Sequence, residues 1–308
     1  MPMFRVERLP IFATCFLLAG AAALARSPAS QASGSAMPRE DSTRLSQTIS
    51  GLKASEQAMY LYERIERVES RKEPQDIQPA EVAVSRVIPA GTGIDHISLG
   101  LDGHPADSAK YRSDLEKLVK SLEWALETGH DQKEAYEKVE KKIRQRDELI
   151  DDTRDAFIFT FVGREMRAGR PLLKYRMDPN PAFKPLNRSA ALFSRVKGYI
   201  WIDEETSQMA RVEGQVIQDI SFGLFLGKIY KGSSFMQERY EMAPGLWLPT
   251  FSEYDFDGRK FFSSISIHEK TFYSHYRRVG PPSETLPIIR AELARLGASS
   301  MNAQGTDP

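Results

Sequence analysis

The chain of 308 residues contains one cysteine, Cys15, so it cannot form an internal disulfide. A single thiol also excludes a multi-cysteine zinc site and an iron–sulfur cluster. Net charge is absent too, because 42 Lys and Arg residues balance 42 Asp and Glu residues. The chain therefore has no overall attraction to nucleic acid. With 41% hydrophobic and 27% charged residues, its composition is typical of a globular protein and excludes a multi-span membrane protein.

Familiar catalytic motifs are missing as well. The sequence has no Gly-x-Ser-x-Gly elbow, no phosphate-binding loop and no His-Glu-x-x-His pair. His268 and His275 lie seven residues apart in one expected strand, which places them on opposite faces and argues against a shared metal. We therefore expect no catalytic residue, no metal and no cofactor. An enzyme whose site is assembled from scattered residues remains an alternative.

The first 25 residues have the pattern of an export signal. Arg5 and Arg8 precede an apolar run over 11–25, which ends in Ala23-Leu24-Ala25. A membrane anchor is the alternative, but spanning hydrocarbon takes about 20 apolar residues. We expect a secretory signal peptide over 1–25 that is cleaved after Ala25 and delivers the chain to a bacterial periplasm without a membrane span.

The remaining chain is expected to hold one domain over 43–296. Small polar residues over 26–42 predict a flexible leader, and 297–308 predicts a loose tail. Within the domain, 107–152 has no proline and one glycine, Gly129, which predicts two amphipathic helices rich in charge. We expect Asp131 to cap the second helix. A coiled coil that recruits a partner is the alternative for this insertion.

Alternating apolar and polar residues predict strands over most of the rest of the chain. The expected strands are one starting near Met59, then 81–88, 94–101, 156–163, 171–178, 197–203, 208–217, 220–227, 229–242, 246–256 and 259–276. Asp257-Gly258 predicts a hairpin turn between the last two. Short connections exclude parallel crossovers, so the sheet should be antiparallel. We expect an α+β fold, mainly antiparallel β, in the form of a curved open half-barrel with amphipathic helices packed on it or plugging it.

Several motifs in the second half of the chain resemble a known family. Gly198 with Ile200–Asp203, then Arg211, then Trp247–Pro249 are similar to the strand motifs of the outer-membrane lipoprotein-sorting proteins, the LolA/LolB-like carrier superfamily. The similarity covers roughly residues 155–278 and is greatest to an acidobacterial-type branch of that superfamily. It implies an unclosed β-barrel with helices at its open side and a hydrophobic cavity for acyl chains.

Aromatic residues are the candidate lining of that cavity. Tyr199 and Trp201 share one face of their strand while Ile200 and Ile202 share the other, so both faces need a cover. The full set of candidates is Tyr199, Trp201, Phe222, Phe225, Tyr240, Trp247 and Phe251. Arg211 is the candidate for binding a lipid head group, with a surface salt bridge as its alternative.

These observations favour a non-catalytic, carrier-like protein of the periplasm that binds a lipid or a lipid-modified protein. Apolar burial contributes about 25 cal/mol per Å², so an acyl chain can bind without many polar contacts. The alternative is a cell-envelope interaction protein that docks a partner through the charged helices at 107–152. Nucleic acid is not an expected partner.

Overall fold

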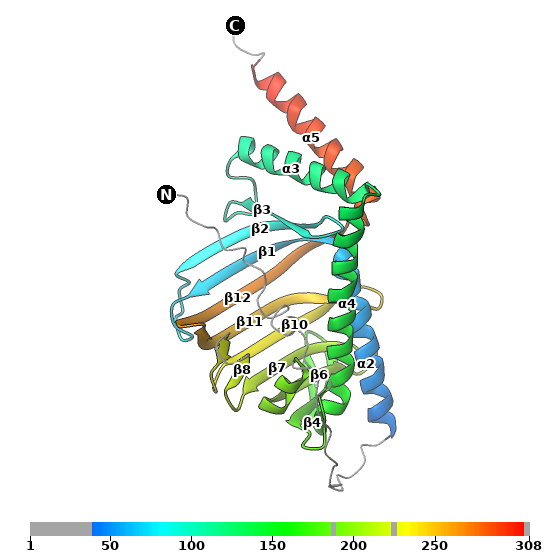
Figure 1. Ribbon diagram of the computed structural model, residues 1–308, viewed down its shortest axis with the longest axis vertical. Coiled ribbons are helices and arrows are strands. Elements are labelled where there is room, and N and C mark those ends of the chain that lie inside the picture. The colour runs from blue at the N-terminus through cyan, green and yellow to red at the C-terminus, as the bar shows by residue number, and fades with distance from the viewer. Residues whose placement is uncertain (1–38, 186–188, 223–226, 305–308) are drawn as a thin grey trace. The chain divides into compact units, whose positions relative to one another are not determined.

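The structure is a computed structural model that describes residues 39–185, 189–222 and 227–304 (Figure 1). The helices are α2 (Arg39–Ala58), α3 (Ser108–Leu126), α4 (His130–Ala156) and α5 (Pro282–Gln304), with single 3₁₀ segments η1 (Met59–Leu61) and η2 (Ala190–Arg195). The first strands are β1 (Tyr62–Arg71), β2 (Glu81–Pro89), β3 (Ile94–Leu99), β4 (Phe157–Arg167), β5 (Arg170–Pro179) and β6 (Val196–Asp203). The others are β7 (Met209–Val216), β8 (Ile220–Phe222), β9 (Gly227–Ile229), β10 (Ser234–Ala243), β11 (Leu246–Lys260) and β12 (Ser263–Arg278).

The strands form one open sheet of twelve strands. Its main path runs β3-β2-β1-β12-β11-β10-β7-β6-β5-β4, so β3 and β4 are the two edges, and β8 and β9 lie off this path. The antiparallel pairs include β1–β2, β2–β3, β1–β12, β4–β5, β5–β6, β6–β7, β8–β9 and β9–β11. The α+β class and the open antiparallel sheet are therefore confirmed. The first strand pairs with the last, with Tyr62 opposite Arg278 and Arg71 opposite His268.

Contacts group the chain into two compact units built from interleaved segments. The first holds the described residues up to Lys53, Lys142–Ser234 and Phe256–Ile265. The second holds Ala54–Lys141, Phe235–Asp255 and the described residues from Ser266 onward. The sequence carries no composition change at these borders, and the expectation of a single domain over 43–296 stays a prediction.

The first unit has a core of helices against strands. One face of β5, β6 and β7 packs against the first part of α2, the last part of α4 and η2. The buried residues of this core are Leu149, Ala156, Phe157, Leu173, Tyr175, Met177, Ala190, Phe193, Ile200, Ile202 and Met209. Two long-range bonds fix α2 in place: the Tyr175 hydroxyl donates to Asp41 Oδ1 (2.7 Å), and Thr48 Oγ1 donates to the Ser207 carbonyl (2.8 Å). The apolar side of β6 at Ile200 and Ile202 is thus covered by protein.

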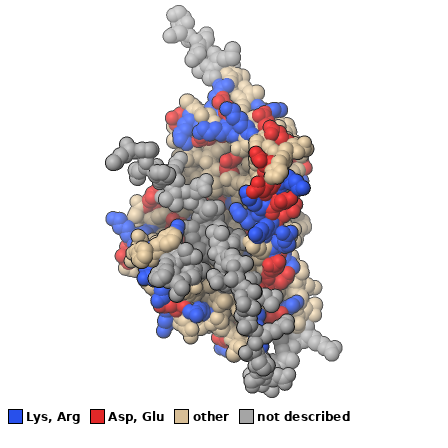
Figure 2. All heavy atoms as spheres, viewed as in Figure 1, with Lys and Arg blue, Asp and Glu red and all other residues tan. Residues whose placement is uncertain are grey.

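The second unit buries the apolar stripe of α3. Leu115, Leu118 and Leu122 are at most 1% exposed and pack with β2, β3 and α5. Asp107 caps α3 by accepting from the Lys110 amide (2.9 Å). The expected pair of amphipathic helices at 107–152 is therefore present. Basic and acidic side chains alternate along α4 on the face shown in Figure 2. This mixture is typical of a helix face that is exposed to solvent.

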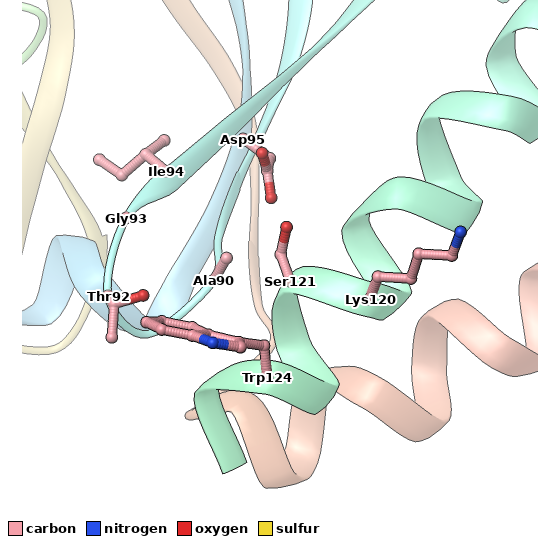
Figure 3. A pocket seen from close by; sticks show the side chains of 8 residues that line it. All are labelled: Ala90, Thr92, Gly93, Ile94, Asp95, Lys120, Ser121 and Trp124. Carbon is pink, nitrogen blue, oxygen red and sulfur yellow. The ribbon is translucent and has the colours of Figure 1, made fainter. Parts of the chain in front are cut away.

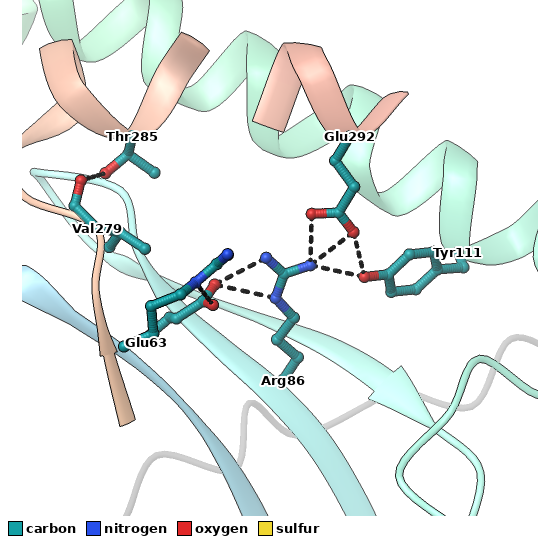
Figure 4. Close-up of polar contacts among 7 residues, drawn as sticks. Glu63, Arg86, Tyr111, Val279, Thr285 and Glu292 are labelled. Carbon is teal, nitrogen blue, oxygen red and sulfur yellow. Dashed lines mark hydrogen bonds and ion pairs between the residues drawn. The ribbon is translucent and has the colours of Figure 1, made fainter. Parts of the chain in front are cut away.

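A buried ionic cluster, made of Glu63, Arg86, Tyr111 and Glu292, connects β1 and β2 to α3 and α5 within the second unit (Figure 4). Arg86 Nη2 lies 2.8 Å from Glu63 Oε2, and Arg86 Nη1 lies 2.8 Å from Glu292 Oε1. The Tyr111 hydroxyl donates to Glu292 Oε1 (2.7 Å). Burial, reinforced by Glu292 and opposed by Arg86, raises the pKa of Tyr111 to about 12. Arg86 therefore joins the two carboxylates, and Glu63 is bound in addition by Arg277 Nε (2.5 Å).

Three boundaries differ from expectation. Helix α2 begins at Arg39, inside the range 26–42 expected to be a flexible leader, and α5 continues to Gln304, inside the expected loose tail 297–308. Helix α4 begins at His130, so Asp131 lies in its first turn and does not cap it. Its carboxylate still interacts favourably with the helix dipole there, which explains the misleading sequence pattern. The signal peptide expected at 1–25 lies outside the described residues. No described helix is long and apolar enough to cross a membrane.

The hairpin turn expected at Asp257-Gly258 is wrong. Strand β11 continues to Lys260, and the turn falls at Phe261 and Phe262. Gly258 pairs with Ile229 of β9, and a Cβ on Gly258 would lie 2.2 Å from the Lys228 carbonyl oxygen. The glycine is required for the close approach of β9, and not for a turn.

We expect Gly258→Ala to destabilise the fold by roughly 1–3 kcal/mol, because the methyl group meets backbone that cannot move aside cheaply. Gly163→Ala is the matched control, since no atom lies within 4 Å of its added Cβ. Urea unfolding of both variants measures the difference. A Gly258→Ala variant as stable as Gly163→Ala would contradict the close-approach explanation.

Candidate functional site

The candidate site begins with a carboxylate on an apolar strand face. Residues 95, 97 and 99 of β3 point to the same side, and Ile97 and Leu99 there pack into the core with α3 and α5. Asp95 occupies the third position of this face, where an apolar residue would normally lie. Its side chain therefore points toward α3 and not into bulk water.

Helix α3 supplies the opposite wall. Ser121 and Trp124 follow Leu118 at intervals of three, so they form the ridge beside the buried leucine stripe. Figure 3 shows Asp95 and Ser121 facing one another, with the Trp124 ring beneath the turn at Thr92 and the Lys120 side chain pointing away. Trp124 is 37% exposed, so one part of its indole packs and another remains open to a ligand.

The turn from β2 to β3 closes the pocket and is held in place. Ala90 donates its amide to the Gly93 carbonyl (2.9 Å), and Gly91 has a φ of 81° that favours glycine. A Cβ on Gly91 would lie 2.5 Å from Pro282 Cγ and 2.8 Å from the Tyr136 hydroxyl. The turn therefore packs directly against α4 and the start of α5, which makes the pocket wall rigid.

Asp95 has an unsatisfied oxygen. Its Oδ2 is buried and has no hydrogen-bond partner among the described residues. Burial raises the pKa of Asp95, and His96 opposes this shift. A buried carboxylate without a partner is costly, because desolvation disfavours its charged form. A ligand that donates a hydrogen bond to Oδ2 would remove that cost.

The pocket has a volume of about 480 Å³, within the range of small-molecule sites. Its lining is Ala90, Thr92, Gly93, Ile94, Asp95, Lys120, Ser121 and Trp124. These side chains offer an aromatic surface, an aliphatic surface, two hydroxyls and one carboxylate. Among the described residues, no three His, Cys, Asp or Glu side chains come together as a metal site would require. The arrangement can bind a molecule that is apolar at one end and donates hydrogen bonds at the other.

The strongest aromatic candidates from the sequence lie in a charged setting. On β6, Trp201 is 6% exposed and Tyr199 is 37% exposed. Lys174 Nζ lies 4.6 Å from the Trp201 ring centre, and the Arg211 guanidinium lies 5.2 Å from it on the neighbouring strand. Trp201 also donates its indole N–H to Glu165 Oε2 (2.8 Å). Arg211, the head-group candidate, also pairs with Glu213. This face of β6 thus carries cation–π contacts.

The other candidates are dispersed. Trp247 is 2% exposed and Tyr240 is 44% exposed, with ring centres 6.3 Å apart on β10 and β11. Phe251 packs against Phe272 of β12, with ring centres 5.1 Å apart and ring planes tilted by 56°. Phe222 ends β8, but its side chain lies outside the described residues, as does all of Phe225. None of the candidates whose side chains the structure describes lines the pocket beside α3.

Sequence reasoning also missed a buried polar cluster in the second unit. Arg64 of β1 pairs with Glu66 (2.7 Å) and is 7% exposed, and its Nη1 has no partner among the described residues. Burial raises the pKa values of Tyr254, Tyr273 and Tyr276 nearby. A sequence signal for this cluster exists, because Tyr62, Arg64 and Glu66 recur at every second position and so share one face of β1.

Comparison with known proteins finds distant structural likenesses, including the three that follow. No family model matches the sequence, and no curated protein does. The chain is similar to a LolA superfamily protein from Nitrosomonas europaea, with 9% identity, a TM-score of 0.28, and coverage of 79% of this chain and 96% of that chain. It is also similar to a domain named for outer membrane lipoprotein sorting from Vibrio parahaemolyticus and to a DUF1329 family protein from Desulfovibrio piger. Each is 10% identical over 76% of this chain and 93% of the other, with TM-scores of 0.26 and 0.24.

Proposed function

We propose that the chain is a non-catalytic, carrier-like binding protein of the periplasm whose ligand is a lipid or a lipid-modified protein, and that the pocket beside α3 binds the polar end of that ligand. The observation that carries this proposal is the partnerless, buried Oδ2 of Asp95 opposite the half-exposed ring of Trp124. Buried polar groups are normally hydrogen-bonded, so an exception inside a pocket is a candidate ligand contact.

The lining favours an amphiphile over a fully polar ligand. Ala90, Ile94 and the Trp124 ring give one side of the pocket an apolar surface. Apolar atoms placed there gain about 25 cal/mol for each Å² removed from water. A fully polar ligand would leave this surface unused and would lose its own hydration.

The polar end of the ligand must carry a hydrogen-bond donor. Asp95 can only accept while it is ionised, and it repels an anion. An amine or a hydroxyl meets this requirement, as in the ethanolamine or glycerol part of a phospholipid. The candidate lining for the acyl chain stays a sequence-based proposal and consists of Tyr199, Trp201, Phe222, Phe225, Tyr240, Trp247 and Phe251.

Two measurements test the proposal. Mass spectrometry of organic extracts of the purified protein should find a stoichiometric lipid. Titration with a short-chain phosphatidylethanolamine should change the fluorescence of Trp124, because Trp201 and Trp247 are both buried elsewhere. A Trp124→Phe variant identifies the reporting side chain. A protein that carries no lipid and shows no fluorescence change with the amphiphile overturns the proposal.

We expect Asp95→Asn to weaken binding of the amine-bearing amphiphile about tenfold, because the lost bond involves a charged acceptor. The same change should raise the unfolding midpoint of the ligand-free protein at neutral pH, because it removes a buried charge whose pKa is raised by burial. That gain should vanish at pH values low enough to protonate Asp95. Asp131→Asn, at a side chain that is 87% exposed, is the control. It should leave binding unchanged and should not raise the unfolding midpoint, because it removes a favourable interaction with the dipole of α4. Equal binding by wild type and Asp95→Asn would exclude Asp95 as a ligand contact.

A further inference from the structure

Two adjacent phenylalanines, both exposed, form the turn that joins β11 to β12; these two strands are labelled in Figure 1. Phe261 is 50% exposed and Phe262 is 88% exposed, so neither side chain packs into the first unit as a core residue would. Exposed single apolar residues are common on proteins, but two large rings side by side at the end of a hairpin form a concentrated apolar tip.

Basic side chains flank the two rings. Arg259 and Lys260 directly precede them, and both are exposed. Across the β11–β9 pairing Arg259 lies opposite Lys228, a placement of like charges that is unfavourable for the pair. Lys231 is exposed as well. Asp219, just before β8, pairs with Lys228 (2.7 Å), and Asp257 is the acidic residue of β11 nearest the turn. The tip therefore keeps an excess of positive charge.

The tip has a fixed and strained conformation. Phe261 has a φ of 53°, a left-handed value that non-glycine residues adopt at some energetic cost. The hairpin below it is firm, because β11 has 15 residues, β12 has 16, and β9 pairs with the last three residues of β11. Phenylalanine is a poor choice for such a position if only a turn is needed. Strain of this kind concentrates where a side chain has a function.

We propose that the β11–β12 tip docks the protein on an anionic membrane surface, with Phe261 and Phe262 inserted at the level of the head groups and Arg259 and Lys260 facing lipid phosphates. Aromatic rings flanked by Lys and Arg are the combination that partitions into a membrane interface. The basic residues select an anionic leaflet. This proposal concerns a different part of the chain from the pocket and does not depend on it.

The test uses the purified full chain and co-sedimentation with vesicles. Vesicles of phosphatidylethanolamine mixed with phosphatidylglycerol provide the anionic surface, and phosphatidylcholine vesicles provide the neutral one. The test variant is Phe261→Asn with Phe262→Ser, since asparagine accepts a left-handed backbone and preserves the turn. Leu101→Ser is the matched control, because Leu101 is 67% exposed at another site. All forms share the same termini, so the apolar run at 11–25 contributes equally to each.

We expect the wild type and Leu101→Ser to bind anionic vesicles equally, and the double variant to bind about 100-fold more weakly. Binding should fall with added salt and should be much weaker on phosphatidylcholine. Circular dichroism checks that the double variant is folded. Three outcomes overturn the proposal: no binding by the wild type, equal binding by the folded double variant, or equal binding to both vesicle types.

Discussion

Arg86→Met should destabilise the protein by about 3–5 kcal/mol, the usual cost of removing one partner from a buried ion pair. Arg86 is 12% exposed, and its removal leaves Glu63 (9% exposed) and Glu292 (19% exposed) without their shared cation. Burial alone would lower the pKa of Arg86, but Glu63, Tyr111 and Glu292 outweigh it and raise that pKa. The raised pKa indicates that the charged guanidinium is bound tightly by its neighbours.

Urea unfolding of the variant gives this cost as the shift in the midpoint at an unchanged slope. Arg290→Met is the matched control, because Arg290 is 58% exposed and pairs with Glu123 at the surface. It should change stability by about 1 kcal/mol or less. Adding Glu292→Gln to Arg86→Met should restore part of the loss, because Glu292 loses its cation whereas Glu63 keeps Arg277, whose Nε lies 2.5 Å from Glu63 Oε1. If Arg86→Met costs no more than Arg290→Met, the cluster does not hold the helices to the sheet.

Leu118→Ala should destabilise the protein by about 2–5 kcal/mol, because it opens a cavity in the core between α3, β3 and α5. Leu118 is 1% exposed, whereas Leu126 on the same helix is 44% exposed. Leu126→Ala removes the same atoms from the surface and should change stability by roughly 0.5 kcal/mol or less. Thermal unfolding of the two variants checks the difference.

The leucine pair also separates the two roles considered for the insertion at 107–152. If the stripe of α3 served mainly to dock a partner, Leu118→Ala would leave the isolated protein as stable as Leu126→Ala does. A large difference means that α3 belongs to the core, and any partner must then use the charged outer faces of the helices.

Local patterns predicted the strands well because they depend on neighbours in the sequence. Alternation and short connections were enough to place β4 to β7 within a few residues. The prediction of a turn at Asp257-Gly258 was wrong for a long-range reason. Strand β9 approaches the backbone at Gly258, and nothing in the local sequence encodes that approach. The prediction that Asp131 caps α4 was wrong because an acidic residue is favourable both at the cap and in the first turn of a helix.

The candidate site was harder to predict because it depends on register. Alternation correctly placed Tyr199 and Trp201 on one face, but not the Lys174 and Arg211 that the neighbouring strands bring to Trp201. The pocket joins Asp95 to Ser121 and Trp124 across two elements. A usable signal did exist, since Asp95 occupies the same face of its strand as Ile97 and Leu99. A charged residue at a core position of a strand is a reason to look for a ligand.

The pairing of β1 with β12 also determines when this protein can fold. Ser70 and Glu269 share a hydrogen bond although 199 residues separate them in the chain. The first strand therefore has no partner on that side until almost the whole polypeptide has been synthesised. Contacts of such long range slow folding, because a large loop must close before they form. The complete sheet should therefore become resistant to proteases only after β12 has been made and has paired with β1.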